Sequence, residues 1–213
     1  MSGFWPVELR SDEVLLRPMT RSDAKDYKEV RIRNHRWLSP WEATDPRGGD
    51  PADFHHLRRL LHRQAKSGRL LPFVIDIGGR LRGQLTVSGF QWSSLMSAQL
   101  GYWIDEQLAG RGHTPTAVAL ATDYCFSGLG LHRMEINIRP ENTASLRVVE
   151  KLGFRYEGLR ERYMHIDGAW ADHASFALLR EDVPFGLLNY WHRNRAQPRP
   201  PTEPLACLRA GCP

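Results

Sequence analysis

The sequence contains little cysteine, and what it has is scattered. Cys125, Cys207 and Cys212 have neither histidine nor further cysteine at metal-ligand spacing. Three cysteines in 213 residues are too few for a secreted, disulfide-stabilised scaffold. We therefore expect unpaired thiols, no metal site, and a fold that depends on its hydrophobic core.

Long apolar runs are also missing. No stretch approaches the ~20 residues that a membrane-spanning helix requires. The N-terminus lacks the basic start and the apolar core of a signal peptide. Hydrophobic residues at 41% and charged residues at 25% are typical of a globular domain. We expect a cytoplasmic protein without membrane contact.

The net charge of +5 favours an anionic partner, which leaves nucleic acid, the ribosome and a phosphorylated cofactor open. The sequence shows no recognition-helix motif, zinc finger or aromatic RNA-binding platform. Direct nucleic-acid binding is therefore not expected.

Residues 105–115 lie between a predicted strand and a predicted helix. Gly110 and Gly112 allow successive backbone N–H groups to turn toward one point. Thr114 is expected to cap the next helix, and Pro115 suits its first turn. A phosphate at this place would meet free amides and the positive end of a helix dipole. A Rossmann fingerprint and a Walker loop are excluded, because their glycine and lysine patterns are absent.

Hydrophobic periodicity predicts strands and helices along most of the chain. Strands are expected at 14–18, 73–77, 81–87, 99–104, 134–138, 163–166 and 169–179, and helices at 20–33, 54–67, 117–128 and 143–152. This order predicts an α+β domain over residues 1–182, with one sheet and helices packed on it. A short amphipathic segment is expected at 183–195, followed by a proline-rich tail at 196–213 to which no structure is assigned.

Three local features permit two interpretations each. Residues 35–51 break the helical pattern, so Trp37 and Trp41 either line a groove from a loop or pack onto the core. Gly101 inside a strand indicates a bulge or a close backbone approach. The aromatic residues near 190 serve either a dimer contact or packing within the domain, so monomer and homodimer both stay open.

Two motifs together resemble the GNAT N-acetyltransferase superfamily. Gln107-x-x-Gly110-x-Gly112 is similar to the signature that holds the pyrophosphate of acetyl-CoA, and residues 137–154 are similar to the family's N-x-x-(A/S)…(E/K)-x-x-G-F segment. The likeness covers residues 12–180. Within the family it is greatest to the Rim-type ribosomal-protein-alanine N-acetyltransferases.

This resemblance implies a mixed, mostly antiparallel sheet with helices on both faces and two strands, 99–104 and 134–138, splayed around acetyl-CoA. Backbone groups of Tyr102, Trp103 and Ile104 would pair with the pantetheine arm. Asn142 would contact the cofactor and cap the helix at 143–152. The residues implied for the pyrophosphate are Gln107, Gly110, Arg111, Gly112, His113 and Thr114.

Acetyl transfer requires that the acceptor ammonium lose a proton and that the departing thiolate gain one. Ser145 falls at the serine of the second motif and is the candidate acid; a back-bonded helix serine is the alternative. Asn137 stands where some N-terminal acetyltransferases of the family carry glutamate, so it can position a water but cannot take a proton. The base stays open among nearby titratable residues, namely Glu135, His165, Asp172 and His173. Asp172 and His173 are not expected to form a dyad, because strand neighbours point to opposite faces.

The leading hypothesis is an acetyl-CoA-dependent N-acetyltransferase that acts on the N-terminal α-amine of a protein, with alanine of a ribosomal protein as the acceptor suggested by the resemblance. One alternative is a transferase for a small amine such as an aminoglycoside or a polyamine. Another is a non-catalytic CoA-binding module, because fold alone does not establish activity.

Overall fold

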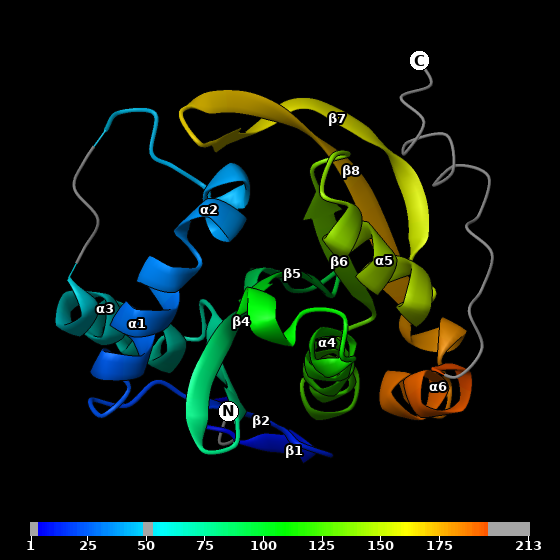
Figure 1. Cartoon of the computed structure of the whole chain (residues 1–213). Helices are drawn as coiled ribbons and strands as arrows, with labels where there is room; N and C mark the ends of the chain where they lie inside the picture. The colour runs from blue at the N-terminus through cyan, green and yellow to red at the C-terminus, as the bar shows by residue number, and fades with distance from the viewer. Residues whose placement is uncertain (1–3, 49–52, 196–213) are drawn as a thin grey trace.

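The computed structural model describes residues 4–48 and 53–195. Strands and helices follow one another along the whole described chain (Figure 1). In order they are β1 (Leu9–Ser11), β2 (Val14–Pro18), α1 (Ala24–Arg33), α2 (His35–Leu38), α3 (Phe54–Lys66), β3 (Leu71–Ile77), β4 (Arg80–Gln91), β5 (Ser97–Ile104), α4 (His113–Asp123), β6 (Arg133–Ile138), α5 (Thr143–Leu152), β7 (Arg155–Ile166), β8 (Ala169–Leu179) and α6 (Leu187–Asn194).

The described strands form one eight-stranded sheet in the order β1-β2-β3-β4-β5-β6-β8-β7. The pair β5–β6 is parallel, and the other neighbours are antiparallel. The expected mixed α+β sheet is confirmed. Strand β1 was not expected; it pairs with β2 across a tight turn in which Asp12 has a positive φ of 49°.

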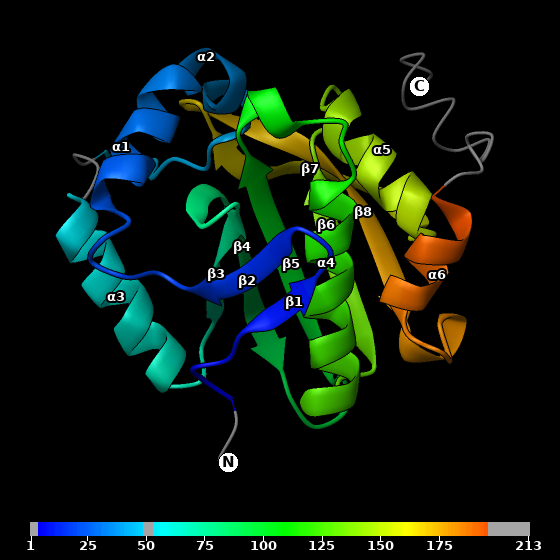
Figure 2. The same cartoon turned by 60° about the horizontal axis from the view of Figure 1, so that its bottom comes forward.

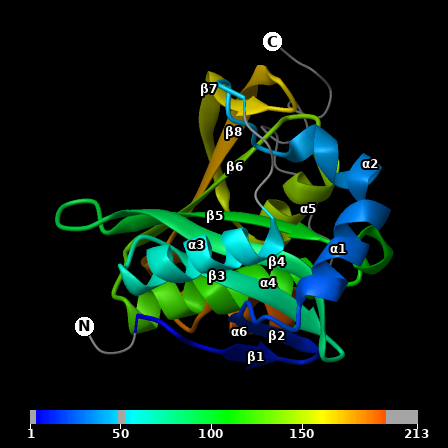
Figure 3. The same cartoon turned by 90° about the vertical axis from the view of Figure 1, so that its left-hand side faces the viewer.

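Helices cover both faces of the sheet, as Figures 2 and 3 show for α3 and α4. Helix α4 packs on β1, β2, β4 and β5 and against α5 and α6, whereas α1 packs on β4 and α3 on β3. The residues of α4 from Thr114 to Thr122 are all buried. A helix that is apolar around most of its circumference belongs in the interior. Helix α4 is therefore the central element of the core.

Strands β5 and β6 stay together over a short distance only. Three residue pairs join them, Ser97 with Arg133, Ala98 with Met134 and Gln99 with Glu135, and no pair follows beyond Gln99 within the described chain. Beyond Gln99, therefore, the backbone edges of residues 100–104 and 136–138 face each other without a ladder. The expected splay of these two strands is present.

The interpretation of residues 35–51 as a loop was wrong for its first part. Residues 35–38 form helix α2, and a 3-10 turn follows at Ser39–Trp41. Leu38 is buried, and the indole N–H of Trp37 donates to the Ile104 carbonyl at 3.3 Å. Contacts with distant residues stabilise these short turns, and hydrophobic periodicity does not register such contacts.

Two predictions about strands also need correction. Gly101 pairs with Thr86 in regular register, and a Cβ added to it would meet no protein atom within 4 Å, so it marks neither a bulge nor a close approach to protein. The irregularity in that pair of strands lies between Ser88 and Gln91. Strand β7 begins at Arg155, well before residue 163, because its first residues already pair with β8.

The chain after residue 182 continues into helix α6, which packs against α4 and α5. Trp191 is buried there, so packing within the domain is the correct interpretation of this tryptophan. The proline-rich tail at 196–213, with Cys207 and Cys212, lies outside the described residues. None of the described helices is long and apolar enough to cross a membrane.

Candidate active site

The turn before α4 exposes backbone amides at the start of a helix. Gly110 and Gly112 have positive φ values of 78° and 91°, a region that favours glycine. Within the described chain, no hydrogen-bond acceptor is found for the N–H groups of Gly110, Arg111 and Gly112. The backbone therefore has the geometry that the prediction requires, and anion binding at this turn stays a prediction.

The cap of α4 differs from the prediction. Gly112, not Thr114, occupies the cap position. Thr114 lies inside the first turn and is buried, and Pro115 follows it there as expected. Because glycine has no side chain with which to cap, the first amides of the helix stay available to a ligand.

A buried carboxylate fixes the end of β5 beside the cradle. Asp105 accepts hydrogen bonds from Arg33 Nη2 at 2.6 Å and from Asn34 Nδ2 at 3.0 Å. The Asn34 Oδ1 atom in turn accepts from the Glu106 N–H at 2.9 Å. Burial raises the pKa of Asp105, but the hydrogen bonds from Arg33 and Asn34 outweigh it and leave the pKa below its ordinary value. A charged Asp105 thus joins α1 to the start of the cradle.

A cavity of about 790 Å³ extends from the cradle along the ends of β5 and α5 to α1 and α2. Its lining includes seven of the residues predicted for the cofactor, namely Tyr102, Trp103, Ile104, Gly110, Gly112, Thr114 and Asn142. Gln107, Arg111 and His113 lie in the same turn but do not line this cavity. Arg147 and Lys151, one turn apart on α5, bring positive charge to its wall.

A second cavity of about 280 Å³ occupies the gap between β5 and β6. It meets the first one, because Trp41, Ala43, Tyr102, Asn142 and Ser145 line both. The two cavities therefore adjoin at these five residues, and together they are called the cleft below.

The second cavity receives residues from one particular face of the sheet. Asn137 pairs directly with Ser175, and His173 lies two residues before Ser175 on β8. Since alternate residues of a strand share a face, these three side chains lie on the same face, together with Gln99 and Gly101 of β5. Asn137, His173, Gln99 and Gly101 line the cavity. A second substrate can thus approach the gap from the face opposite α4.

The candidate acid lies where the two cavities meet. Asn142 accepts a hydrogen bond from the Ser145 backbone N–H at 3.0 Å, which confirms its expected capping role. The Tyr102 hydroxyl is buried, and no hydrogen bond of good geometry to it is found within the described residues. Burial raises the pKa of Tyr102, and the nearby Ser145 side chain offsets part of the rise. Ser145 and Tyr102 are therefore the hydroxyl groups available at the junction.

The open candidates for the base differ sharply in position. Glu135 is half-buried, bonds Arg133 at 2.8 Å and Arg160 at 3.4 Å, and lines neither cavity. His165 is half-buried, lines neither cavity and bonds the Thr44 hydroxyl at 2.7 Å. Asn137 lines the second cavity, where its Oδ1 accepts from the Ser175 hydroxyl at 2.7 Å.

Asp172 and His173 do not form a dyad, as the alternation of a strand predicts. Asp172 accepts from the Arg162 backbone N–H at 2.7 Å, whereas His173 points into the second cavity. Among the described residues, no cluster of three or more His, Cys, Asp or Glu side chains is arranged to hold a metal ion.

The long cavity suits an elongated, phosphorylated ligand. The backbone amides and the cationic side chains of its lining can bind phosphate, and its apolar walls can contact an aliphatic arm. Its volume lies in the range of small-molecule sites, about 300–1,000 Å³.

Comparisons with known proteins agree with this geometry. The family model described as "Acetyltransferase (GNAT) domain" matches residues 13–155. The structure of Mycobacterium smegmatis RimJ in complex with CoA-disulfide matches with a TM-score of 0.78 and 37% identity, over 89% of this chain and 92% of that chain.

Two curated relatives extend this result. The ribosomal protein uS5-alanine N-acetyltransferase of Escherichia coli (strain K12) is 28% identical over 179 residues, which are 83% of this chain and 92% of that protein. The probable N-acetyltransferase YjcK of Bacillus subtilis (strain 168) is 42% identical over 99 residues, or 46% of this chain and 55% of that protein. This chain therefore belongs to the GNAT family of N-acetyltransferases, which use acetyl-CoA.

Proposed function

We propose that this enzyme acetylates the N-terminal α-amine of a protein, and that the acceptor residue is alanine of a ribosomal protein. The observation that carries the proposal is the charge of the second cavity. Arg139 is the charged side chain in its lining, and no carboxylate of the described chain lines it. Such a cavity favours an acceptor with a single amine of modest basicity.

An α-amine meets that condition. Its pKa of about 8 lies well below the value of about 10.4 for a lysine side chain, so it is more readily deprotonated. Polyamines and aminoglycosides carry several ammonium groups, which are bound best by an acidic site. The second cavity offers them no carboxylate, since its one charged lining side chain is Arg139, which is already paired with Glu141 at 3.2 Å.

The relatives support the same acceptor class. The E. coli protein is named for the alanine of ribosomal protein uS5, and its likeness spans most of both chains at 28% identity. A ribosomal acceptor would place the enzyme in the cytoplasm and make a protein its partner.

In this proposal the long cavity holds acetyl-CoA. Backbone groups of Tyr102, Trp103 and Ile104 face the pantetheine arm, because β5 has lost β6 as a neighbour there. The residues assigned to the pyrophosphate are Gln107, Gly110, Arg111, Gly112, His113 and Thr114, and Asn142 contacts the cofactor. A backbone N–H on the open edge of β5 serves the oxyanion.

Two side chains take part in the transfer, one at the leaving thiolate and one at the acceptor. Ser145 supplies the proton that the departing thiolate needs, since it lies at the junction of the two cavities. Asn137 holds the acceptor or a water through its amide nitrogen, because its oxygen already accepts from Ser175.

The test is acetyl-CoA consumption by the purified protein with peptides that begin with Ala, Ser or Met, with an acetyl-Ala peptide, and with a panel of polyamines and aminoglycosides. We expect turnover on a free N-terminal Ala and none on the blocked peptide. Turnover on small amines alone would replace the proposal by the small-amine alternative. CoA binding without any turnover would make the protein a binding module.

A further inference from the structure

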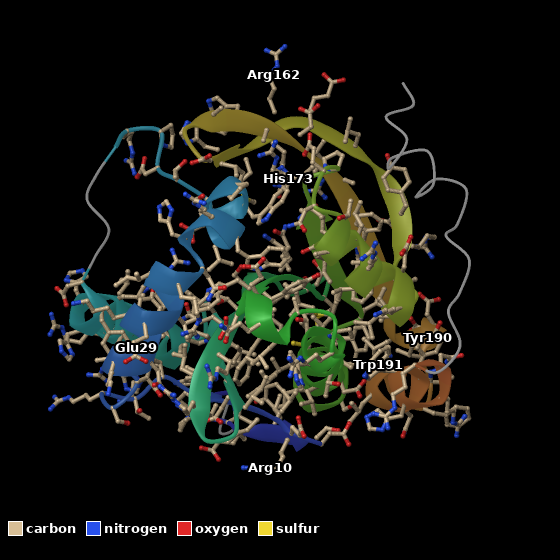
Figure 4. All side chains as sticks on the ribbon, viewed as in Figure 1. Arg10, Glu29, Arg162, His173, Tyr190 and Trp191 are labelled. Carbon is tan, nitrogen blue, oxygen red and sulfur yellow. The ribbon has the colours of Figure 1, made fainter. Side chains whose placement is uncertain are left out.

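One histidine lies inside the cleft and takes no part in the steps described above. His173 of β8 is 3% exposed and lines the second cavity. In Figure 4 it lies beneath the arch of β7 and β8, on the side of α2. It lies one residue before Ala174, which pairs with Ile138 at the end of β6. His173 therefore sits beside the wide end of the gap in the sheet.

The contacts of His173 define which of its ring nitrogens is free. Its Nδ1 atom lies 3.0 Å from the carbonyl oxygen of Ala171. A carbonyl only accepts, so Nδ1 carries the hydrogen and the lone pair of the neutral ring is on Nε2. No hydrogen bond to Nε2 is found within the described residues. The Tyr163 ring packs edge-on at 5.8 Å between centroids and restrains the imidazole.

The surroundings of the ring keep it neutral near pH 7. Burial is the main cause that lowers the pKa of His173, and the positive charge of Arg139 adds to it. The Ala171 carbonyl, Glu141 and Asp172 act in the opposite direction but do not reverse the result. Glu141 is paired with Arg139 at 3.2 Å. A neutral imidazole is the form that accepts a proton.

We propose that Nε2 of His173 is the general base that takes a proton from the acceptor ammonium, directly or through one water. The inference rests on the proposed function. It assigns the role that the other candidates cannot fill. Asn137 has no basic atom, Glu135 is ion-paired outside the cleft, and His165 lines neither cavity and is bonded to Thr44.

The protons of the transfer balance with this assignment. His173 takes the first proton from the ammonium, and the amine then attacks the thioester carbonyl. The new C–N bond forms, the C–S bond breaks, and the second proton on nitrogen passes, by way of the Ser145 hydroxyl, to the departing thiolate. His173 returns its proton to solvent after product release. The net products are the amide, CoA thiol and one proton.

The decisive variant is His173→Gln, which keeps a polar side chain of similar size and removes the basic nitrogen. At pH 7 we expect kcat/KM for the Ala peptide to fall by roughly 100-fold, a usual contribution of a general base. The difference in kcat/KM between wild type and His173→Gln should shrink toward pH 9, because the acceptor is then largely free amine. Affinity for CoA should stay unchanged.

The matched control is His165→Gln, on the same hairpin but outside both cavities. We expect kcat/KM to change within about twofold at every pH, because this side chain lines neither cavity. If the loss of kcat/KM in His173→Gln is constant from pH 6 to pH 9, the histidine only packs the site. That result would overturn the inference.

A second measurement keeps this result distinct from failure of the proposed function. If the wild type turns over only a small amine, the proposed acceptor is wrong, and the same pH comparison is made with that amine. Independently of turnover, ¹⁵N NMR of the wild type should show a neutral His173 with the hydrogen on Nδ1 at pH 7. Hydrogen on Nε2 at that pH, or no turnover of any amine, would also overturn the inference.

Discussion

The indole N–H of Trp191 donates a hydrogen bond to the Thr116 hydroxyl at 3.0 Å. The Thr116 hydroxyl in turn donates to the carbonyl of Gly112 at 3.0 Å, and a Cβ on Gly112 would meet the Trp191 ring at 3.3 Å. Helix α6, which Figure 4 shows with its labelled Trp191, thus supports the cradle from behind. The C-terminal helix and the ligand-binding turn are parts of one hydrogen-bonded unit.

Replacing Trp191 by Phe keeps most of the packing and removes the donor. We expect the free energy of unfolding to fall by about 1 kcal/mol, the usual net value of a hydrogen bond. Trp170→Phe is the control, because Trp170 is 56% exposed and its replacement should cost less than about 0.5 kcal/mol. Urea denaturation measures both. Equal values for the two variants would contradict the role given to the Trp191 bond.

The cradle can be tested with two glycines of the same conformation. Gly110 and Gly130 have positive φ values of 78° and 72°, and an added Cβ would meet no atom within 4 Å at either position. Alanine should cost roughly 1–2 kcal/mol of stability at both, through strain in the left-handed region. Only Gly110→Ala should weaken CoA binding, by roughly tenfold, because alanine disfavours the positive φ that aims the N–H groups of this turn at the phosphate. Calorimetric titration measures the affinity of both variants for CoA. Equal losses of affinity at the two positions would show that the cradle does not bind CoA.

The proton donor can be tested with Ser145→Ala. We expect kcat to fall by roughly tenfold or more, because the departing thiolate loses its acid, while CoA affinity stays the same. The buried hydroxyl of Tyr102 lies beside Ser145, so Tyr102→Phe is the companion variant. If the two hydroxyls act as a unit, the double variant should be hardly slower than the worse single variant. Wild-type turnover by Ser145→Ala would make the serine purely structural.

Stability should depend on one carboxylate at the outer edge of the sheet. Hydrogen bonds from Arg133 and Arg155, partly opposed by burial, hold the pKa of Glu157 at about 2. The charged form stabilises the fold by about 1–3 kcal/mol. Because the pKa is lower in the folded state, this contribution is complete above the ordinary value of 4.5 and is lost as the pH falls toward 2.

We therefore expect Glu157→Gln to be less stable than the wild type at pH 7, with a difference that narrows from pH 5 to pH 3. Urea denaturation at each pH measures it. Glu161→Gln is the control, because Glu161 is an exposed glutamate of the same strand. If the difference in unfolding free energy between wild type and Glu157→Gln stays constant with pH, the ionised carboxylate is not its cause.

The larger features of the fold could be predicted because they leave local patterns. The alternation around Ile75 and Ile136, the glycine before α4 and the glycine after α5 set most boundaries to within a few residues. Helix α2 could not be predicted, since the Trp37 bond to Ile104 joins residues 67 positions apart. Single helical turns depend on such contacts more than on their own sequence.

The candidate site, like the fold, could be predicted only where it leaves a local sequence pattern. The cradle is a contiguous motif, so Gly110 and Gly112 were recognisable from their spacing. The Asp105 carboxylate was missed, because its partner Arg33 lies 72 residues away in the sequence and carries no motif. His173 was one of several open candidates, and only the pairing of β6 with β8 brings it to the gap beside Asn137.

The most direct test of the proposed acceptor is to locate the acetyl group on a peptide that offers a choice. The peptide begins with a free Ala and carries one internal lysine, and tandem mass spectrometry reads the site after reaction with acetyl-CoA. We predict acetylation of the Ala α-amine and an unmodified lysine. Acetyl on the lysine side chain, or an unmodified peptide beside an acetylated polyamine in the same tube, would contradict the proposed acceptor.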